Sequence, residues 1–192
     1  MKHPSIRELF DYWTERRGDR PAPERADIEP GSIRRALADT FVLAFDPQAG
    51  HPFRIAGTRA CAAFARELKG EAFVELWAAE SRPLVRDLLT SVAHESIAAV
   101  AGVRGTSAEG ELDFELLTLP LSQSGRTDVR VLGAFAPMDI PYWFGVHPIT
   151  RLTLGTLRYL EPATTGAAEP GGVAAMPGRQ RRGLVVYDGG QA

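Results

Sequence analysis

The side chains that could carry chemistry are few and scattered along the chain. Cys61 is the single cysteine among 192 residues, so it cannot form an internal disulfide, and no CxxC or Cys/His cluster could hold a structural metal. The four histidines, His3, His51, His94 and His147, include no pair at metal-ligand spacing. We therefore expect no metal site. A small buried thiol is the ordinary role for a cysteine like Cys61.

Motifs of known enzyme classes are absent from the sequence. It contains no G-x-S-x-G elbow, H-E-x-x-H pair, P-loop or G-x-G-x-x-G fingerprint. Glu111, Asp113 and Glu115 alternate along one predicted strand, where solvated charges are expected. Catalysis by this chain therefore has little support.

The segment of residues 53–77, FRIAGTRACAAFARELKGEAFVELW, contains the best candidates for ligand binding. Arg59 follows a Gly-Thr turn and could hold a carboxylate or phosphate ligand, or it could bind Asp27 or Glu29 of the preceding segment. We favour the second, structural role. Phe64, Phe73 and Trp77 could line a cavity together with Cys61, although aromatic residues at this spacing are more often core.

Composition limits the class of protein. With 44% hydrophobic residues the chain can bury one main core, and its 22 basic and 24 acidic residues give a net charge of -2. This balance argues against a nucleic-acid partner. The longest apolar runs are too short to span a bilayer, so we expect no membrane insertion and a cytoplasmic protein.

The N-terminal 30 residues predict a helix followed by an extended strap. Ser5 and Glu8 match a capping box, Ile6, Leu9, Phe10 and Trp13 form one apolar stripe, and Gly18 ends the helix. Residues 19–30 contain three prolines and suit an extended connection. The apolar stripe must be buried, and Phe10 and Trp13 are the candidates for an interface with a second copy.

Residues 31–140 predict an α+β domain. A short helix over residues 31–38 precedes a hairpin of strands 41–45 and 53–56, then short helices at 59–65 and 72–77 and a longer helix from Ser81 to Glu95. Thr58 is the expected cap of the helix at 59–65. Strands at 97–104, 111–122 and 129–138 complete the domain. This order predicts a five-stranded antiparallel sheet with helices on one side.

The C-terminal 52 residues give weaker signals. Residues 141–161 form an extension in which 152–160 favours an extended segment. Residues 162–178 are rich in proline and glycine and predict a flexible tail. The end of that tail, with Arg179, Arg181, Arg182 and LVVY, could add a strand to a sheet edge or bind an acidic partner, or remain disordered.

This element order resembles a PAS domain. RRGDRPAPERADIEP at 16–30 and the G-T-R block at 57–59 are similar to the proteobacterial PAS family first catalogued as a domain of unknown function. The resemblance covers roughly residues 5–140. It implies a five-stranded sheet and small helices around a cavity, and a sensory or regulatory role exercised through partner proteins or flanking helices.

The resemblance also sets expectations for cofactors. The stretch GTRACAAFA lacks the Asn, Arg and Gln of the G-x-N-C-R-F-L-Q motif, so no flavin adduct is expected at Cys61. His94 lies opposite the apolar stripe of its predicted helix, so no haem is expected either. We predict a stand-alone regulatory module with a signalling protein partner, possible homodimerisation and a possible small ligand. The alternatives are a small enzyme that uses the same cavity and a ligand-free interaction module.

Overall fold

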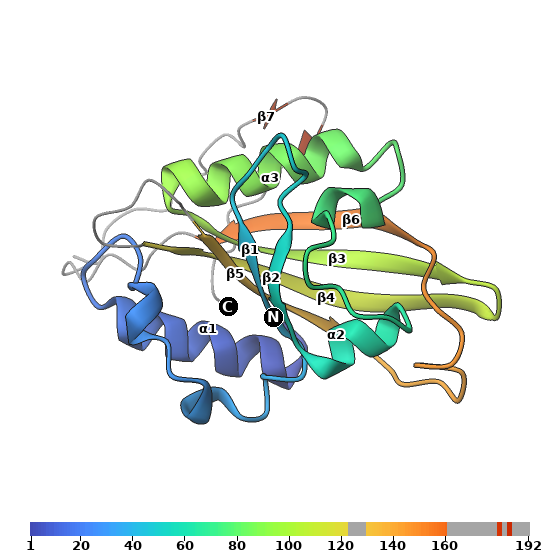
Figure 1. Cartoon of the computed structure of the whole chain (residues 1–192). Coiled ribbons are helices and arrows are strands. Elements are labelled where there is room, and N and C mark those ends of the chain that lie inside the picture. Colours follow the sequence, from blue (N-terminus) through green and yellow to red (C-terminus); the bar gives the residue numbers. More distant parts are fainter. Residues whose placement is uncertain (123–129, 161–179, 182–183, 186–192) are drawn as a thin grey trace, which may run out of the picture.

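Six antiparallel strands form the central sheet of this protein (Figure 1). The computed structural model describes residues 1–122 and 130–160, with residues 180–181 and 184–185. The strand order is β2-β1-β5-β4-β3-β6. The bounds are β1 Thr40–Ala44, β2 Phe53–Ala56, β3 Ala98–Ser107, β4 Gly110–Leu121, β5 Arg130–Pro137 and β6 Arg151–Leu160.

Helices cover both faces of the sheet. They are α1 Pro4–Arg17, α2 Thr58–Ala63 and α3 Arg82–Glu95, with short 3-10 helices at Arg25–Asp27, Pro30–Ile33 and Phe73–Leu76. Figure 1 shows α1 and α3 on opposite sides of the sheet. We call the face covered by α1 the outer face and the face covered by α3 the inner face. The expected α+β fold is confirmed. Two details differ: residues 151–160 add a sixth strand beside β3, and α1 lies on the face opposite to α2 and α3.

The helix caps differ from those expected. His3, not Ser5, caps α1, because its Nδ1 accepts a hydrogen bond from the Ser5 amide while Pro4 occupies the first helical position. Gly57, not Thr58, caps α2. The Ser81 side chain makes no cap for α3; its hydroxyl accepts the Leu154 amide at 3.1 Å and so helps to anchor β6.

The α1 helix packs on the outer face of the sheet. Ile6, Leu9 and Trp13 are buried against the outer-face side chains of β4 and β5, Leu117, Leu119, Leu121 and Leu132 among them. The Trp13 indole N–H donates to the Pro120 carbonyl at 2.9 Å, so the polar group of this large ring has its hydrogen-bond partner within the same chain. The apolar stripe is thus mostly buried within one copy, and only Phe10 remains half-buried.

Glu115 holds the N-terminal end of α1 on β4. Its carboxylate accepts the Lys2 amide at 2.9 Å and the His3 amide at 2.7 Å, and the side chain is buried. The expectation that Glu115 is a solvated surface charge is therefore wrong, although Glu111 and Asp113 are exposed as expected. A carboxylate at a helix N-terminus is stabilised by the amide dipoles that it accepts from.

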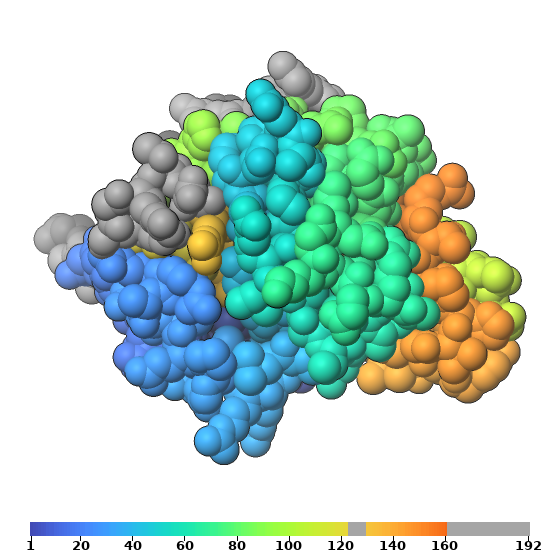
Figure 2. Space-filling model, in the orientation of Figure 1, coloured from blue at the N-terminus to red at the C-terminus, as the bar shows by residue number. Residues whose placement is uncertain are grey.

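The strap of residues 19–30 lies against the same face. Arg25 donates its amide to the Ser122 carbonyl, and Ser122 donates its own amide to the Pro23 carbonyl. The Tyr12 hydroxyl donates to the Asp27 carbonyl and accepts the Glu29 amide, which links the strap to α1. Figure 2 shows this N-terminal part (blue) packed beside the β1–β2 hairpin (cyan).

Little of the C-terminal tail falls within the described residues. Two short strands, β7 Gln180–Arg181 and β8 Leu184–Val185, pair with each other in a separate two-stranded sheet. The expected flexible segment 162–178 and the predictions for Arg179, Arg182 and Tyr187 lie outside the described residues. In the part of the chain that the structure describes, no helix has the length and apolar character needed to cross a membrane.

Replacing Glu115 tests how firmly α1 is held. We expect Glu115→Ala to lower the free energy of unfolding by about 1.5–3 kcal/mol, because two amides lose a charged acceptor. Asp113→Ala on the same strand, which removes only an exposed ion pair, is the control and should cost about 1 kcal/mol or less. Urea unfolding measures both. Equal losses would contradict the role given to Glu115.

Candidate functional site

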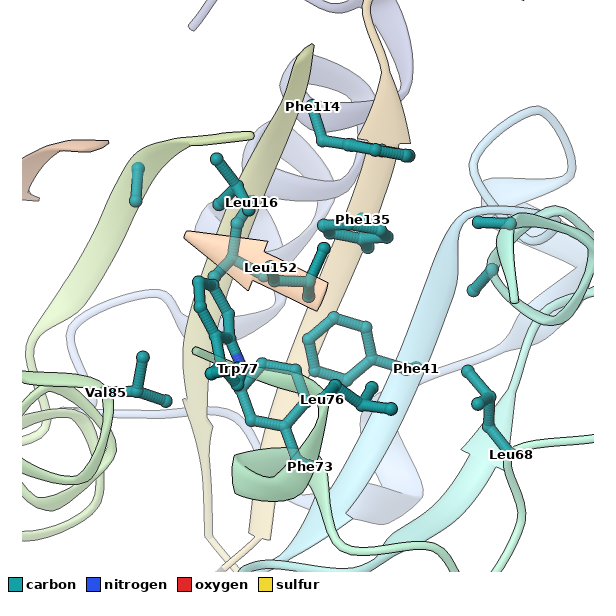
Figure 3. Packing of buried hydrophobic residues seen from close by; sticks show 14 of the residues in the cluster. Phe41, Leu68, Phe73, Leu76, Trp77, Val85, Phe114, Leu116, Phe135 and Leu152 are labelled. Atoms are coloured by element: carbon teal, nitrogen blue, oxygen red, sulfur yellow. The ribbon is translucent and has the colours of Figure 1, made fainter. Parts of the chain in front are cut away.

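Aromatic rings fill the inner face, where the sequence predicted a cavity. Phe41, Phe73 and Trp77 lie together below Phe114 and Phe135 (Figure 3). Phe73 is 5.6 Å from both Phe41 and Trp77 between ring centroids, and Phe114 stacks on Phe135 at 4.2 Å. Such contacts each add to the free energy gained by burial. This cluster is a packed core.

A small void lies inside this core. It has a volume of about 10 Å³ and is lined by Phe64, Phe73, Leu152 and other core residues. Ligand pockets usually measure about 300–1,000 Å³, and about 10–15 Å³ is needed for one water molecule. Phe64 and Phe73 thus border a space too small for a ligand, while Trp77 is buried beside it.

The G-T-R block is a structural junction. A Cβ on Gly57 would lie 2.3 Å from the Leu37 carbonyl oxygen, so the backbones meet here too closely for any side chain. The amides of Arg59 and Ala60 both donate to the Ala38 carbonyl. These contacts join the start of α2 to the residues just before β1.

Arg59 completes the same junction. Its guanidinium lies 2.7 Å from a carboxylate oxygen of Asp39, a side chain with no exposed surface. The structural role was predicted, but the expected partners Asp27 and Glu29 are wrong. Asp27 instead pairs with Arg20, and the Glu24 amide and that guanidinium lower the pKa of its carboxyl.

Cys61 lies in α2 with most of its surface buried. Burial raises the pKa of its thiol, and the nearby Glu67 carboxylate acts in the same direction. A thiol held protonated is a poor nucleophile. Its surroundings are those of a small packing residue.

His51 is the most unusual polar side chain near the inner core. It is 1% exposed, adopts φ 59° in the β1–β2 turn, and its Nδ1 has no hydrogen-bond partner among the described residues. Burial lowers the pKa of its imidazole. The ring contacts Phe45, which also contacts His94 at 5.0 Å; His94 itself is exposed. No group of three or more potential metal ligands occurs within the described residues.

A large groove lies on the outer face, where the sequence analysis predicted no site. Its volume is about 900 Å³, and it crosses β4, β3 and β6 beside Met1 and Lys2, which precede α1. The small residues Gly102, Gly155 and Thr156 form part of it, and Asp113, Arg104 and Arg158 supply charge. The sequence signal for this groove is the change along β4 from charged residues, ending at Glu115, to leucines, beginning at Leu117. This change marks the edge of the area that α1 covers.

Exposed apolar side chains continue from this groove into the β5–β6 connection. Met138, which lines the groove, is 42% exposed, and the connection that follows contains three more exposed apolar residues: Ile140 at 60%, Tyr142 at 89% and Val146 at 69%. Trp143 in the same connection is buried in the inner core and holds it in place. A group of exposed apolar residues next to a groove is typical of a protein-binding surface.

Removing the charge of Arg59 tests the junction. Arg59→Met keeps much of the side-chain volume but leaves Asp39 buried without its cation, so we expect a loss of about 2 kcal/mol in unfolding free energy. This is below the value for a fully buried pair because Arg59 is 33% exposed. Arg66→Met, which breaks the exposed pair with Glu71, is the control and should cost less than about 1 kcal/mol. Similar losses in chemical denaturation would refute the assignment.

The buried His51 predicts a pH dependence of stability. Since its pKa is lowered in the folded state, the unfolded chain takes up the proton first as pH falls below about 6.5, and the folded state loses stability there. We expect the melting temperature to fall less between about pH 7.5 and about pH 5 in His51→Asn, because asparagine tolerates positive φ and does not titrate. Calorimetry on both proteins measures this, and an unchanged pH profile would show that His51 is not responsible.

Comparison with known proteins agrees with this architecture. Residues 1–136 match the family described as PAS domain, which includes α1, the strap and the first five strands. No curated protein and no solved structure matches the chain. Since the match covers well over half of the 192 residues, the chain belongs to the PAS domain family.

Proposed function

We propose that this PAS domain is a regulatory module that acts through protein contacts on its outer face, without a ligand in its core. PAS domains are in general sensory and regulatory modules rather than enzymes. The observation that carries the proposal is the contrast between an inner void of about 10 Å³ and an outer groove of about 900 Å³. A signalling protein in the cytoplasm is the expected partner.

The shape and composition of the groove support a protein partner. Small residues on β3 and β6 allow close approach of another backbone, and charged side chains around them supply polar contacts. The exposed Met138 and the apolar residues that follow extend the surface beyond the groove. Protein interfaces combine an apolar centre with a polar rim in this way.

A small enzyme and a small ligand in the core both have less support than a module that acts without a core ligand. An enzyme needs an acid and a base that converge in a pocket, and the inner void is lined by apolar side chains only. A ligand in the core would have to displace packed rings, because the void holds at most one water. Among the described residues, the buried indole N–H of Trp77 in the inner cluster has no hydrogen-bond partner.

Site-specific photo-crosslinking in the native cells tests this function. A photoreactive amino acid replaces Thr156, which is exposed in the groove, and a control replaces Arg86, which is exposed on α3. We expect discrete protein adducts from position 156 and none from position 86. The proposal is wrong if position 156 gives no adduct while the variant is folded and present at the normal level.

A further inference from the structure

We infer that residues 184–188, which begin with β8, add to the free edge of β6 as a further antiparallel strand. The inference goes beyond the proposed function, because it concerns an edge of the sheet and a segment of the same chain. It rests on the backbone groups that β6 leaves unpaired and on the small size of the β7–β8 sheet.

The two edges of the central sheet are covered to different extents. At one edge, residues 70–72 pair with the start of β2. At the other edge, the Leu152 carbonyl of β6 accepts the Ala78 amide, and the Leu154 amide donates to the Ser81 hydroxyl. Within the described residues, no backbone hydrogen bond from outside the sheet reaches β6 beyond Leu154. The second half of this edge is therefore open.

Leu157 and Tyr159 direct their backbone groups to this open side. The Leu154 amide points away from β3, because it donates to Ser81. The β3 partners of Leu157 and Tyr159 lie two and four residues before Val103, which is the partner of Leu154. Alternate residues of a strand bond to opposite sides, so the amides and carbonyls of Leu157 and Tyr159 also point away from β3. Such groups on an edge strand are a template for another strand.

The small β7–β8 sheet offers a strand with matching free groups. Arg181 and Leu184 pair across a two-residue turn, so they exchange both hydrogen bonds of that closing pair. Val185 consequently directs its amide and carbonyl away from β7. Strands of two residues each are marginal by themselves and gain stability from a third strand. At about 3.3 Å per residue, the connection of residues 161–179 is long enough for β8 to reach β6.

One antiparallel register joins these free groups. It places Val185 opposite Tyr159 and Tyr187 opposite Leu157, so that each pair exchanges two backbone hydrogen bonds. In this arrangement β8 binds β6 on one side and β7 on the other. A register shifted by two residues would place Gly183 opposite Tyr159, where no side chain could cover the tyrosine ring.

The same register matches apolar side chains and charge. Tyr159 and Leu160 are half-buried and pack on the inner and outer cores respectively. The register brings Leu184 opposite Leu160 and places Asp188 diagonally from Arg158, which is exposed and has no ion pair among the described residues. Cross-strand pairs of both kinds stabilise a sheet. The added strand extends the sheet beside the outer groove, which Arg158 lines.

Amide hydrogen exchange of the full chain, measured by NMR, tests the inference. The amides of Leu157 and Tyr159 should exchange slowly in the wild type, because β8 accepts their hydrogen bonds. Val185→Pro removes an amide that faces β6 and should speed exchange at both positions about tenfold or more. The matched control is Val186→Pro, whose missing amide faces away from β6, and it should leave both rates unchanged. The Arg158 amide, which faces β3, shows in each variant that β6 is intact.

Several results would overturn it. The inference fails if Leu157 and Tyr159 exchange in the wild type as fast as in an unstructured peptide, or if their protection survives Val185→Pro. Protection that rises with protein concentration would assign the edge to a second copy and would equally reject the C-terminal strand. If the edge amides are unprotected while photo-crosslinking at position 156 yields adducts with another protein, this inference fails and the proposed function stands.

Discussion

The change of side-chain character along the outer face of β4 determines the arrangement of the molecule. Glu111, Asp113 and Glu115 precede Leu117, Leu119 and Leu121 on the same face of one strand. An apolar sheet face must be covered by other residues, whereas a charged face must remain hydrated or bind another molecule. The α1 helix therefore begins beside Glu115 and covers only the leucine half.

Glu115 lies at the boundary between the charged half and the leucine half of the outer face of β4, and it binds the residues immediately before α1. Its carboxylate would be costly to bury without partners, and the amides of Lys2 and His3 provide them. The same contact sets where α1 starts, and thus how much of β3 and β6 remains open. The groove is a direct consequence of this boundary, because a helix that began nearer to Glu111 would cover it.

Local sequence signals predicted the local structure well. The β1–β2 hairpin follows from two β-prone runs separated by a Pro- and Gly-rich turn, and α3 follows from Pro83 and a regular apolar stripe. The sixth strand was only weakly indicated, since residues 151–160 pair with β3, about fifty residues earlier, and nothing near them in sequence shows that pairing.

The site was harder to predict because its contacts are long-range. Arg59 binds Asp39 through a backbone junction at Gly57, whereas Asp27 and Glu29 were chosen by charge alone. Glu115 accepts amides more than 110 residues away, so the exposed Glu111 and Asp113 on the same face of its strand indicated the wrong environment. The expected cavity depends on how Phe41, Phe73, Trp77 and Phe135 pack, and packing of rings cannot be read from their spacing.

The central claim is that the interior is filled and that contacts are made outside. Native mass spectrometry of freshly purified protein, with an absorbance spectrum, tests it most directly. The account predicts the mass of the chain alone or of whole-number multiples of it, and absorbance from protein only. A bound non-protein mass that is lost on denaturation, or a band in the visible range, would contradict the account, because the void among the described core residues measures about 10 Å³.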